Sequence, residues 1–189
     1  MKRSKTVDDM DLSDLVVVFC LYETALSGYG VRTRLRDWRL TEYHAMSPAT
    51  IYRCLTRLQE QGHLASREVR NGNYPASRVF RITASGRRHY RRLMKEICTF
   101  KGDAPPLFPL IGLGSFLPRR ERVALARAWM KAATAERDLL QRRLADHSAG
   151  ATYGKPFAEW LLLDHRASRL QADLDWIKKY IDLMTSGRA

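Results

Sequence analysis

The sequence has few cysteines, no long apolar run and no glycine-rich phosphate loop. Its three cysteines, Cys20, Cys54 and Cys98, lie far apart, with no Cys-x-x-Cys pair and no histidine at ligand spacing. This dispersal argues against a disulfide framework or a zinc site and indicates reduced thiols in a cytoplasmic protein. The longest apolar run, residues 15–22, is eight residues long, whereas a membrane-spanning helix needs about 20. Aspartates precede this run and no small-residue cleavage site follows it, so we expect no export signal.

The chain also lacks the arrangements that catalysis requires. Gly28 and Gly30 are without the third glycine and the preceding strand of a dinucleotide site. Ser47 and Ser85 occupy positions that suit helix caps rather than a nucleophile elbow. We therefore expect a protein that is not an enzyme and that uses no cofactor and no metal. Surface or structural roles are expected for all histidines: His44, His63, His89, His147 and His165.

Positive charge is what the sequence has in excess. The chain of 189 residues carries 33 Lys and Arg against 20 Asp and Glu, a formal net charge of +13. Between residues 32 and 95 there are 15 basic and four acidic residues, a surplus of +11. Nearly all of the excess therefore lies in the first half. A surface of this sign attracts polyanions, so nucleic acid is the first partner to consider.

Proline and glycine mark a boundary in the middle of the chain. Residues 98–117 hold three prolines and three glycines within an otherwise apolar stretch. This composition predicts a first domain at residues 12–97 and a helical domain at residues 118–186, joined by an apolar connection at 98–117.

The first domain is predicted to be mainly α-helical with a small β-hairpin. Two runs of alternating apolar residues, 64–69 and 79–82, flank a turn-forming cluster at 71–75, which is typical of a hairpin. Three helices, a hairpin and a further helix make a winged helix-turn-helix. The expected helices cover residues 12–26, 31–38 and 47–61, and a fourth runs from a cap at Thr83 to residue 97.

The helix at 47–61 has the features of a DNA-recognition helix. Ser47 suits its N-cap, Pro48 its first position and Gly62 a left-handed stop after it. One face is predicted to be buried through Ile51, Leu55 and Leu58. The other face carries small, hydroxyl and arginine side chains that suit a major groove: Ala49, Thr50, Tyr52, Arg53, Thr56 and Arg57.

The hairpin that follows is basic, and we expect residues 70–78 to form a wing at the adjacent groove. A solvated helix face with two arginines is the alternative for residues 47–61 taken alone, and the basic hairpin favours nucleic acid. A further cluster (Arg87, Arg88, Arg91 and Arg92) suits either water or phosphates. The predicted DNA-binding residues are Ser47, Ala49, Thr50, Tyr52, Arg53, Arg57, Arg70, Asn73, Tyr74 and Arg78.

These motifs together resemble the PadR family of bacterial transcriptional regulators. The resemblance covers about residues 12–97 and implies that the helix at 47–61 enters the major groove with Tyr52 at the DNA face. The sequence departs from the family pattern at Arg53-Cys54, where Pro-Ala is usual, and at Ser77-Arg78, where Arg-Lys is usual, so operator preference does not carry over. The matching motifs are Ser27-Gly28-Tyr29-Gly30, Ser47-Pro48-Ala49-Thr50-Ile51-Tyr52 with Leu55, Leu58 and Gly62, and Phe80 with Ile82-Thr83 and Gly86.

The second domain is predicted to be a helical hairpin that dimerises. Helices are expected over about 118–147 and from Pro156 onward, joined by a short loop at 148–155. Apolar residues in the last helix follow steps of three and four, as in a coiled-coil seam. The alternative is a hairpin that only covers itself or the winged helix. The proposed dimerisation residues are Trp160, Leu163, Leu170, Leu174, Ile177 and Ile181.

This half resembles the C-terminal dimerisation domain of the virulence-activator branch of PadR proteins, through Phe108-Pro109-Leu110 to Leu117-Pro118 and Leu174-Asp175-Trp176. In that branch, helices of both subunits interlock. Residues 105–113 are expected to pack on these helices. The alternative is a pocket for a small aromatic effector formed by this segment with one of three tryptophans: Trp129, Trp160 or Trp176.

The sequence therefore predicts a cytoplasmic, homodimeric, sequence-specific DNA-binding transcriptional regulator, a repressor or dual regulator, that binds a two-fold symmetric operator. A sequence-independent or architectural nucleic-acid binder has the same charge but would leave no footprint at a palindrome. A third hypothesis uses the winged helix to contact acidic protein partners.

Overall fold

The computed structural model describes residues 9–70, 76–100, 104, 107–148 and 155–186. These residues divide into two compact units. The first unit consists of residues 9–96 together with Ile111–Phe116, and the second of residues 97–110 and 117–186, with the gaps just given. The apolar connection expected at 98–117 is thus shared between the two units.

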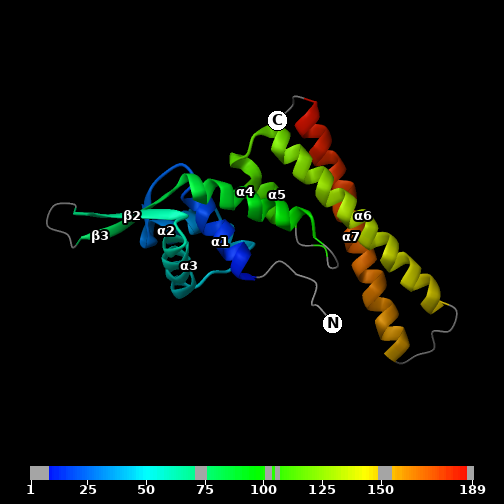
Figure 1. The fold of residues 1–189 in the computed structure, drawn as a ribbon. Helices are drawn as coiled ribbons and strands as arrows, with labels where there is room; N and C mark the ends of the chain where they lie inside the picture. Colours follow the sequence, from blue (N-terminus) through cyan, green and yellow to red (C-terminus); the bar gives the residue numbers. More distant parts are fainter. Residues whose placement is uncertain (1–8, 71–75, 101–103, 105–106, 149–154, 187–189) are drawn as a thin grey trace. The chain divides into compact units, whose positions relative to one another are not determined.

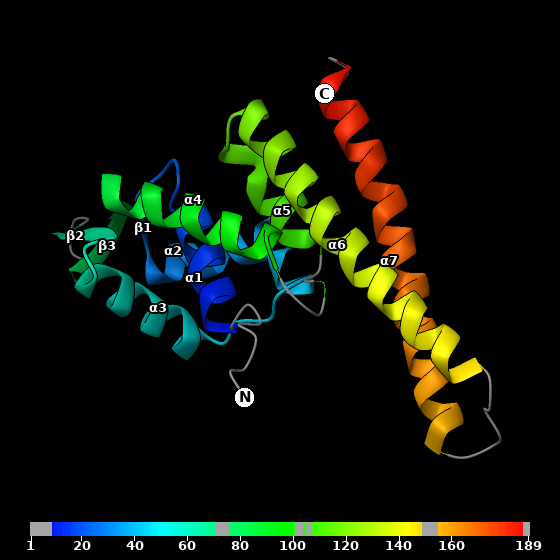
Figure 2. The ribbon, with the colours of Figure 1, turned by 45° about the vertical axis from the view of Figure 1, so that its right-hand side comes forward.

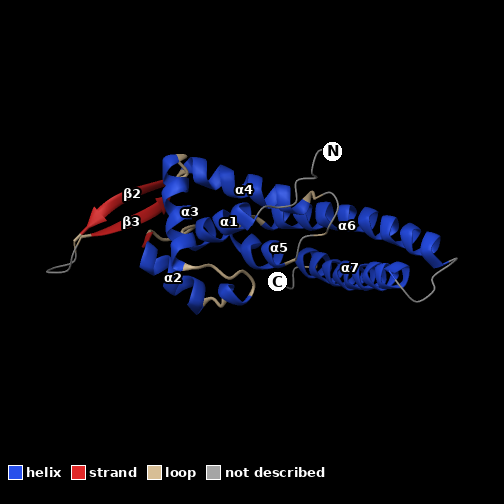
Figure 3. Cartoon of the chain, turned by 90° about the horizontal axis from the view of Figure 1, so that it is seen from below, coloured by secondary structure: helices blue, strands red, loops and turns tan. Residues whose placement is uncertain are grey.

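The first unit is a set of helices beside a three-stranded antiparallel sheet (Figures 1 and 3). In the sheet, β3 (Ser77–Ile82) lies between β1 (Leu26–Ser27) and β2 (Leu64–Val69). The fold class expected from the sequence, mainly α with a small β wing, is confirmed. The helices are α1 (Asp9–Cys20), α2 (Gly28–Asp37), α3 (Pro48–Glu60) and α4 (Ala84–Cys98), with short 3-10 turns η1 (Leu40–Glu42) and η2 (Leu113–Phe116).

The largest difference from the predicted elements lies between α1 and α2. The helix predicted at 12–26 instead covers Asp9–Cys20, because Leu26 and Ser27 pair with Phe80 and Val79 and form a strand. Ser27 is therefore not a helix stop. Its Oγ accepts the N–H of Gly30 at 3.1 Å and caps the N-terminus of α2.

Helix α3 begins and ends where its sequence signals place it. Ser47 is the N-cap, and its Oγ accepts the N–H of Thr50 at 3.1 Å, while Pro48 occupies the first turn. After Gln61, Gly62 adopts a φ of +73°, the left-handed conformation that ends helices most readily at glycine. The inward face buries the three predicted apolar residues and also Cys54.

The apolar run of residues 15–22, which begins in α1 and ends just after it, is buried on every side. Residues 15–22 are all at most 8% exposed, because α2, α3 and η2 pack around this segment. The η2 segment contributes Phe116, whose ring stacks on Tyr22 at a centroid distance of 4.9 Å. The eight-residue run is therefore the centre of a globular core, and no helix among the described residues could cross a membrane.

The second unit is a long antiparallel helical hairpin, α6 (Arg119–Ser148) and α7 (Lys155–Thr185), which lie side by side in Figures 1 and 2. The short helix α5 (Phe108–Gly112) precedes them. Trp129 of α6 is completely buried at the centre of this hairpin core. The α7 residues buried in the same core are Leu163, Leu170, Leu174, Ile177 and Tyr180.

Candidate nucleic-acid interface

The outward face of α3 carries a small network of polar side chains at its N-terminus. The hydroxyls of Ser47 and Thr50 lie 2.9 Å apart, and Arg53 Nη2 donates to Thr50 Oγ1 at 3.2 Å. Ala49 and Arg53 are exposed, and Thr50 is partly exposed. The N-terminal turn thus presents a methyl group, hydroxyls and a guanidinium within one patch, which are groups that can contact base edges and phosphates.

Tyr52 is held in place by a close approach of α2. A Cβ added at Gly28 would lie 2.7 Å from Tyr52 Cζ, so the tyrosine ring rests on the glycine backbone at the start of α2. Tyr52 nonetheless stays 54% exposed, and Tyr29, the next residue on α2, is 69% exposed. The DNA-binding residues predicted from the sequence did not include Tyr29. The Ser27 cap is the signal that could have placed it on the first turn of a helix.

Arg57 points inward rather than to the outer face of α3. Its Nη2 donates to Asp14 Oδ1 at 2.6 Å and its Nε to Oδ2 at 3.3 Å. Asp14 belongs to α1 and is 5% exposed. A bidentate arginine–carboxylate pair has fixed geometry, so Arg57 holds α3 against α1. Burial is the main reason that the neighbouring Cys54 thiol has a pKa raised to about 12, with Asp14 adding to it.

The wing places its arginines on two different faces. Arg78 of β3 stands directly opposite Glu68 of β2, and the alternation along the strands puts Arg67 and Arg81 on the other face. Arg70 follows β2 and is exposed. Two predicted wing residues, Asn73 and Tyr74, lie outside the described residues.

The arginines of α4 are partly used inside the first unit. Arg87 Nη2 donates to the carbonyl of Tyr22 at 3.0 Å, and its guanidinium lies 4.5 Å from the centre of the Tyr22 ring. Arg92 Nη1 donates to Glu96 Oε1 at 2.8 Å. These two residues stabilise the fold, so the cluster as a whole is not a free cationic patch.

Two histidines stack between the end of α3 and the start of α4. The rings of His63 and His89 have centroids 4.1 Å apart and an interplanar angle of 16°. Arg92 Nη2 lies 2.9 Å from His89 Nδ1, and His89 Nε2 is buried with no partner among the described residues. Burial first, then the His63 and Arg92 charges, lower the pKa of His89 to about 4. Burial also lowers the pKa of His63, and Arg92 adds to the effect. Both rings are thus neutral at pH 7.

The described residues contain no cluster of three His, Cys, Asp or Glu side chains that could hold a metal ion.

Of the residues expected to form a dimer seam, four are at most 4% exposed because α6 already covers them: Leu163, Leu170, Leu174 and Ile177. Among the proposed effector tryptophans, Trp129 is fully buried, and its Nε1 has no hydrogen-bond partner within the described residues.

Helices α2 and α3 form a helix-turn-helix in which Tyr52 packs on Gly28, and a β wing follows. This arrangement defines the first unit as a winged helix-turn-helix domain. Its sequence allows a narrower assignment. Residues 17–92 match the sequence pattern of the Transcriptional regulator PadR-like family, and this part of the chain is a PadR-family domain. The resemblance inferred from the motifs is therefore confirmed for this domain.

Solved structures of PadR-like proteins resemble the chain weakly. PadR of Bacillus subtilis in complex with operator DNA is 18% identical, with a TM-score of 0.44 over 92% of this chain and 99% of that one. A PadR-like transcriptional regulator from Bacillus cereus is 20% identical, with a TM-score of 0.41 over 95% and 99%. PadR of Bacillus subtilis with p-coumaric acid is 18% identical, with a TM-score of 0.41 over 95% and 98%. A comparison with curated proteins gave no match.

Proposed function

We propose that this protein is a dimeric, sequence-specific DNA-binding transcriptional regulator, acting as a repressor or dual regulator. In this proposal α3 enters the major groove and residues 70–78 contact the adjacent groove. The observation that carries it is the exposed N-terminal patch of α3, where Thr50 and Arg53 share a hydrogen bond on the solvent side of a helix whose opposite face is buried.

The residues that we propose to contact DNA are fewer than those predicted from the sequence. Arg53 is the arginine free to pair with guanine O6 and N7, and Ala49 and Thr50 allow close approach. Tyr52 holds phosphate or sugar from its seat on Gly28. Arg57 is engaged with Asp14, so we assign it to orienting α3 rather than to reading bases.

The proposed dimer uses a different stripe of α7 from the one the seam pattern predicts, because the hairpin core already occupies that seam. Leu162, Trp176 and Leu183 are 65%, 41% and 49% exposed. Trp176 follows Leu162 by 14 residues and Leu183 follows Trp176 by seven, so the three side chains lie along one side of the helix. The Trp176 ring stacks on Tyr180 at 5.7 Å, which supports it from the buried side.

A dimer of this kind would present two α3 helices to one duplex, with half-sites about 34 Å apart if they lie one helical turn from each other. A ligand that changed the spacing of the two α3 helices would change operator affinity. A small aromatic effector is part of the proposal, and titration calorimetry with simple aromatic acids tests it directly.

Selection of bound duplexes from a random-sequence library with the purified full chain tests the function. We expect a palindromic consensus with two half-sites. Enrichment of no consensus, with equal affinity for random duplexes, would instead establish a sequence-independent binder, and loss of all duplex binding at moderate salt would reject both.

A further inference from the structure

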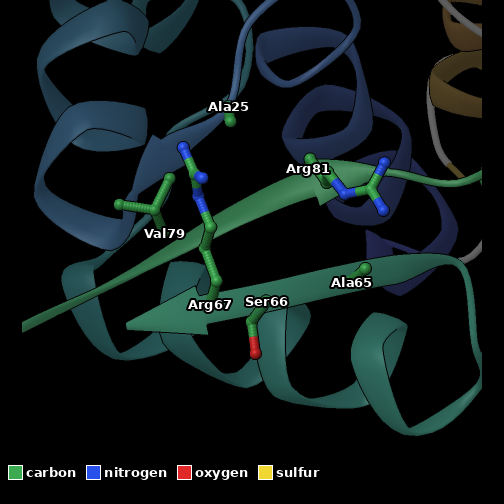
Figure 4. A pocket seen from close by; sticks show the side chains of 6 residues that line it. All are labelled: Ala25, Ala65, Ser66, Arg67, Val79 and Arg81. Atoms are coloured by element: carbon green, nitrogen blue, oxygen red, sulfur yellow. The ribbon is translucent and has the colours of Figure 1, made fainter. Parts of the chain in front are cut away.

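The outer face of the wing sheet has a hollow that the proposed DNA interface does not use. It has a volume of about 490 Å³ and is formed by residues of β2 and β3 together with Ala25 just before β1 (Figure 4). The residues that line it are Ala25, Ala65, Ser66, Arg67, Val79 and Arg81.

Strand register explains why two arginines meet at this hollow. Ala65 pairs with Arg81 and Arg67 with Val79, so these four side chains project from one face of the sheet. Arg67 and Arg81 are diagonal neighbours across the two strands, an arrangement in which the backbone positions of the two residues lie about 7–8 Å apart. The opposite face carries Phe80, which is 5% exposed and belongs to the core of the unit.

The charge in this hollow is of one sign. No acidic residue lines it, and Glu68, the only carboxylate on β2, faces the other side opposite Arg78. Two cationic side chains with no carboxylate beside them make this hollow attractive to anions.

The shape of the hollow indicates the kind of anion. Figure 4 shows the Arg67 side chain crossing β3 toward Ala25, whereas the guanidinium of Arg81 points away from Arg67 along β3. Each guanidinium can bind one phosphate through two parallel N–H donors. Because the two guanidinium groups lie at different ends of one hollow, the hollow suits two linked phosphate groups better than a single small ion.

We propose that the outer face of the wing sheet is a binding site for linked phosphate groups, held by Arg67 and Arg81. The same chemistry occurs in a free oligophosphate and in the phosphodiester backbone of a nucleic acid. The site is separate from the α3 patch, since α3 lies on the core side of the sheet with Leu64 and Phe80.

The test follows the arginine Nε–Hε signals of the full chain by NMR, first with sodium tripolyphosphate and then with a mixed-sequence duplex. Shifts of the Arg67 and Arg81 signals on adding tripolyphosphate, with Arg142 of α6 unmoved, support a site for free oligophosphates. Shifts that occur only with duplex support the site with the DNA backbone as its source. No shift with either probe overturns the proposal.

Variants make the test quantitative. The double variant R67Q/R81Q should weaken binding of the effective probe by about tenfold or more in titration calorimetry, because two charge-assisted contacts are lost. The matched variant R120Q/R142Q removes the same charge from exposed positions on α6 and should bind within about twofold of the unmodified chain. Equal losses in both variants would show a general charge effect and reject the site. A chain that binds tripolyphosphate but no duplex would keep this site while rejecting the proposed function.

The R67K/R81K variant guards against a folding artefact, since lysine keeps the charge but not the planar fork. It should bind more weakly than the unmodified chain and more tightly than R67Q/R81Q, with an unchanged circular dichroism melting curve. Binding equal to that of the unmodified chain would reduce the site to a non-specific charge effect and reject the proposal.

Discussion

Arg57 Nη2 of α3 lies 2.6 Å from Asp14 Oδ1 of α1, a contact between residues 43 positions apart in the chain. Asp14 has a side chain that is only 7% exposed, whereas that of Arg57 is 27% exposed. The carboxylate thus depends on this arginine for charge compensation, and the arginine is held away from any groove that α3 would enter.

Replacing Arg57 should therefore affect stability and not base preference. We expect Arg57→Ala to lower the free energy of unfolding by about 3 kcal/mol, because it leaves a buried carboxylate unpaired. Operator and random duplexes should lose affinity by the same factor. Urea unfolding and binding titrations measure the two effects. The double variant D14N/R57A should recover part of the stability. A change in base preference in Arg57→Ala would show instead that this residue contacts bases.

Arg53→Ala should have the opposite profile. Arg53 is exposed and bonds only Thr50 among the described residues, so stability should hardly change. Loss of a bidentate guanine contact should cost about 1–3 kcal/mol on the selected operator and relax preference at one base pair. Fluorescence anisotropy with the operator and single-base variants measures this, with Arg142→Ala as the charge-matched control. Full retention of base preference would remove Arg53 from the proposed readers.

The close approach of Gly28 to Tyr52 predicts a steric effect that a second substitution can relieve. Gly28→Ala should destabilise the domain by about 1–3 kcal/mol through overpacking against the tyrosine ring. Adding Tyr52→Ala should return most of that stability while DNA affinity stays low. Thermal unfolding follows the first effect and anisotropy the second.

Gly62→Ala is a useful comparison for Gly28→Ala. Gly62 has a φ of +73° and no atom within 4 Å of an added Cβ. Its substitution should cost about 1–2 kcal/mol through the backbone alone, and no change at Tyr52 should recover it. Recovery of Gly62→Ala by Tyr52→Ala would contradict the steric explanation.

The stacked His63–His89 pair predicts that the first unit loses stability in mild acid. The pKa of both rings is lowered in the folded protein, that of His89 to about 4, so the unfolded chain binds more protons as pH falls below about 6.5. The stability is fully present above that pH and is lost progressively down to about pH 4. The charges that act on the pair are those of Arg57, Arg88 and Arg92, opposed by Asp14 and Glu96.

Between pH 7.5 and pH 5 we expect the free energy of unfolding to fall by about 2 kcal/mol, since each unit of pKa difference is worth about 1.4 kcal/mol. Urea unfolding at several pH values measures it. In His89→Phe, which keeps a ring but cannot bind a proton, the fall should be clearly smaller. An equal slope in both proteins would show that other groups cause it.

Substitutions at Trp176 and Leu174 distinguish the proposed dimer surface from the hairpin core. Trp176→Glu should give a folded monomer in light scattering and weaken operator binding, because the residue is 41% exposed. Leu174→Glu should instead unfold the hairpin, since Leu174 is 1% exposed and a lone buried carboxylate is costly. Ser168→Glu, which adds the same charge at another exposed position of α7, is the control. A dimeric Trp176→Glu would reject this stripe.

Much of the first domain was predictable because its signals are local. The N-cap at Ser47, the stop at Gly62 and the buried spacing of Ile51, Leu55 and Leu58 depend on neighbours within a few residues. The alternation in β2 and β3 is equally local. The strand β1 was missed because two residues carry no periodic pattern, and only pairing with β3 makes them a strand.

The sequence by itself determined which residues share a helix face or a strand face, since that follows from periods of 3.6 and 2 residues. The tertiary structure decided what each face contacts. It turned Arg57 toward Asp14, placed Tyr52 on Gly28 and covered Leu170 and Leu174 with α6. These contacts join segments distant in the chain, and their geometry depends on how whole elements pack, which no local pattern encodes.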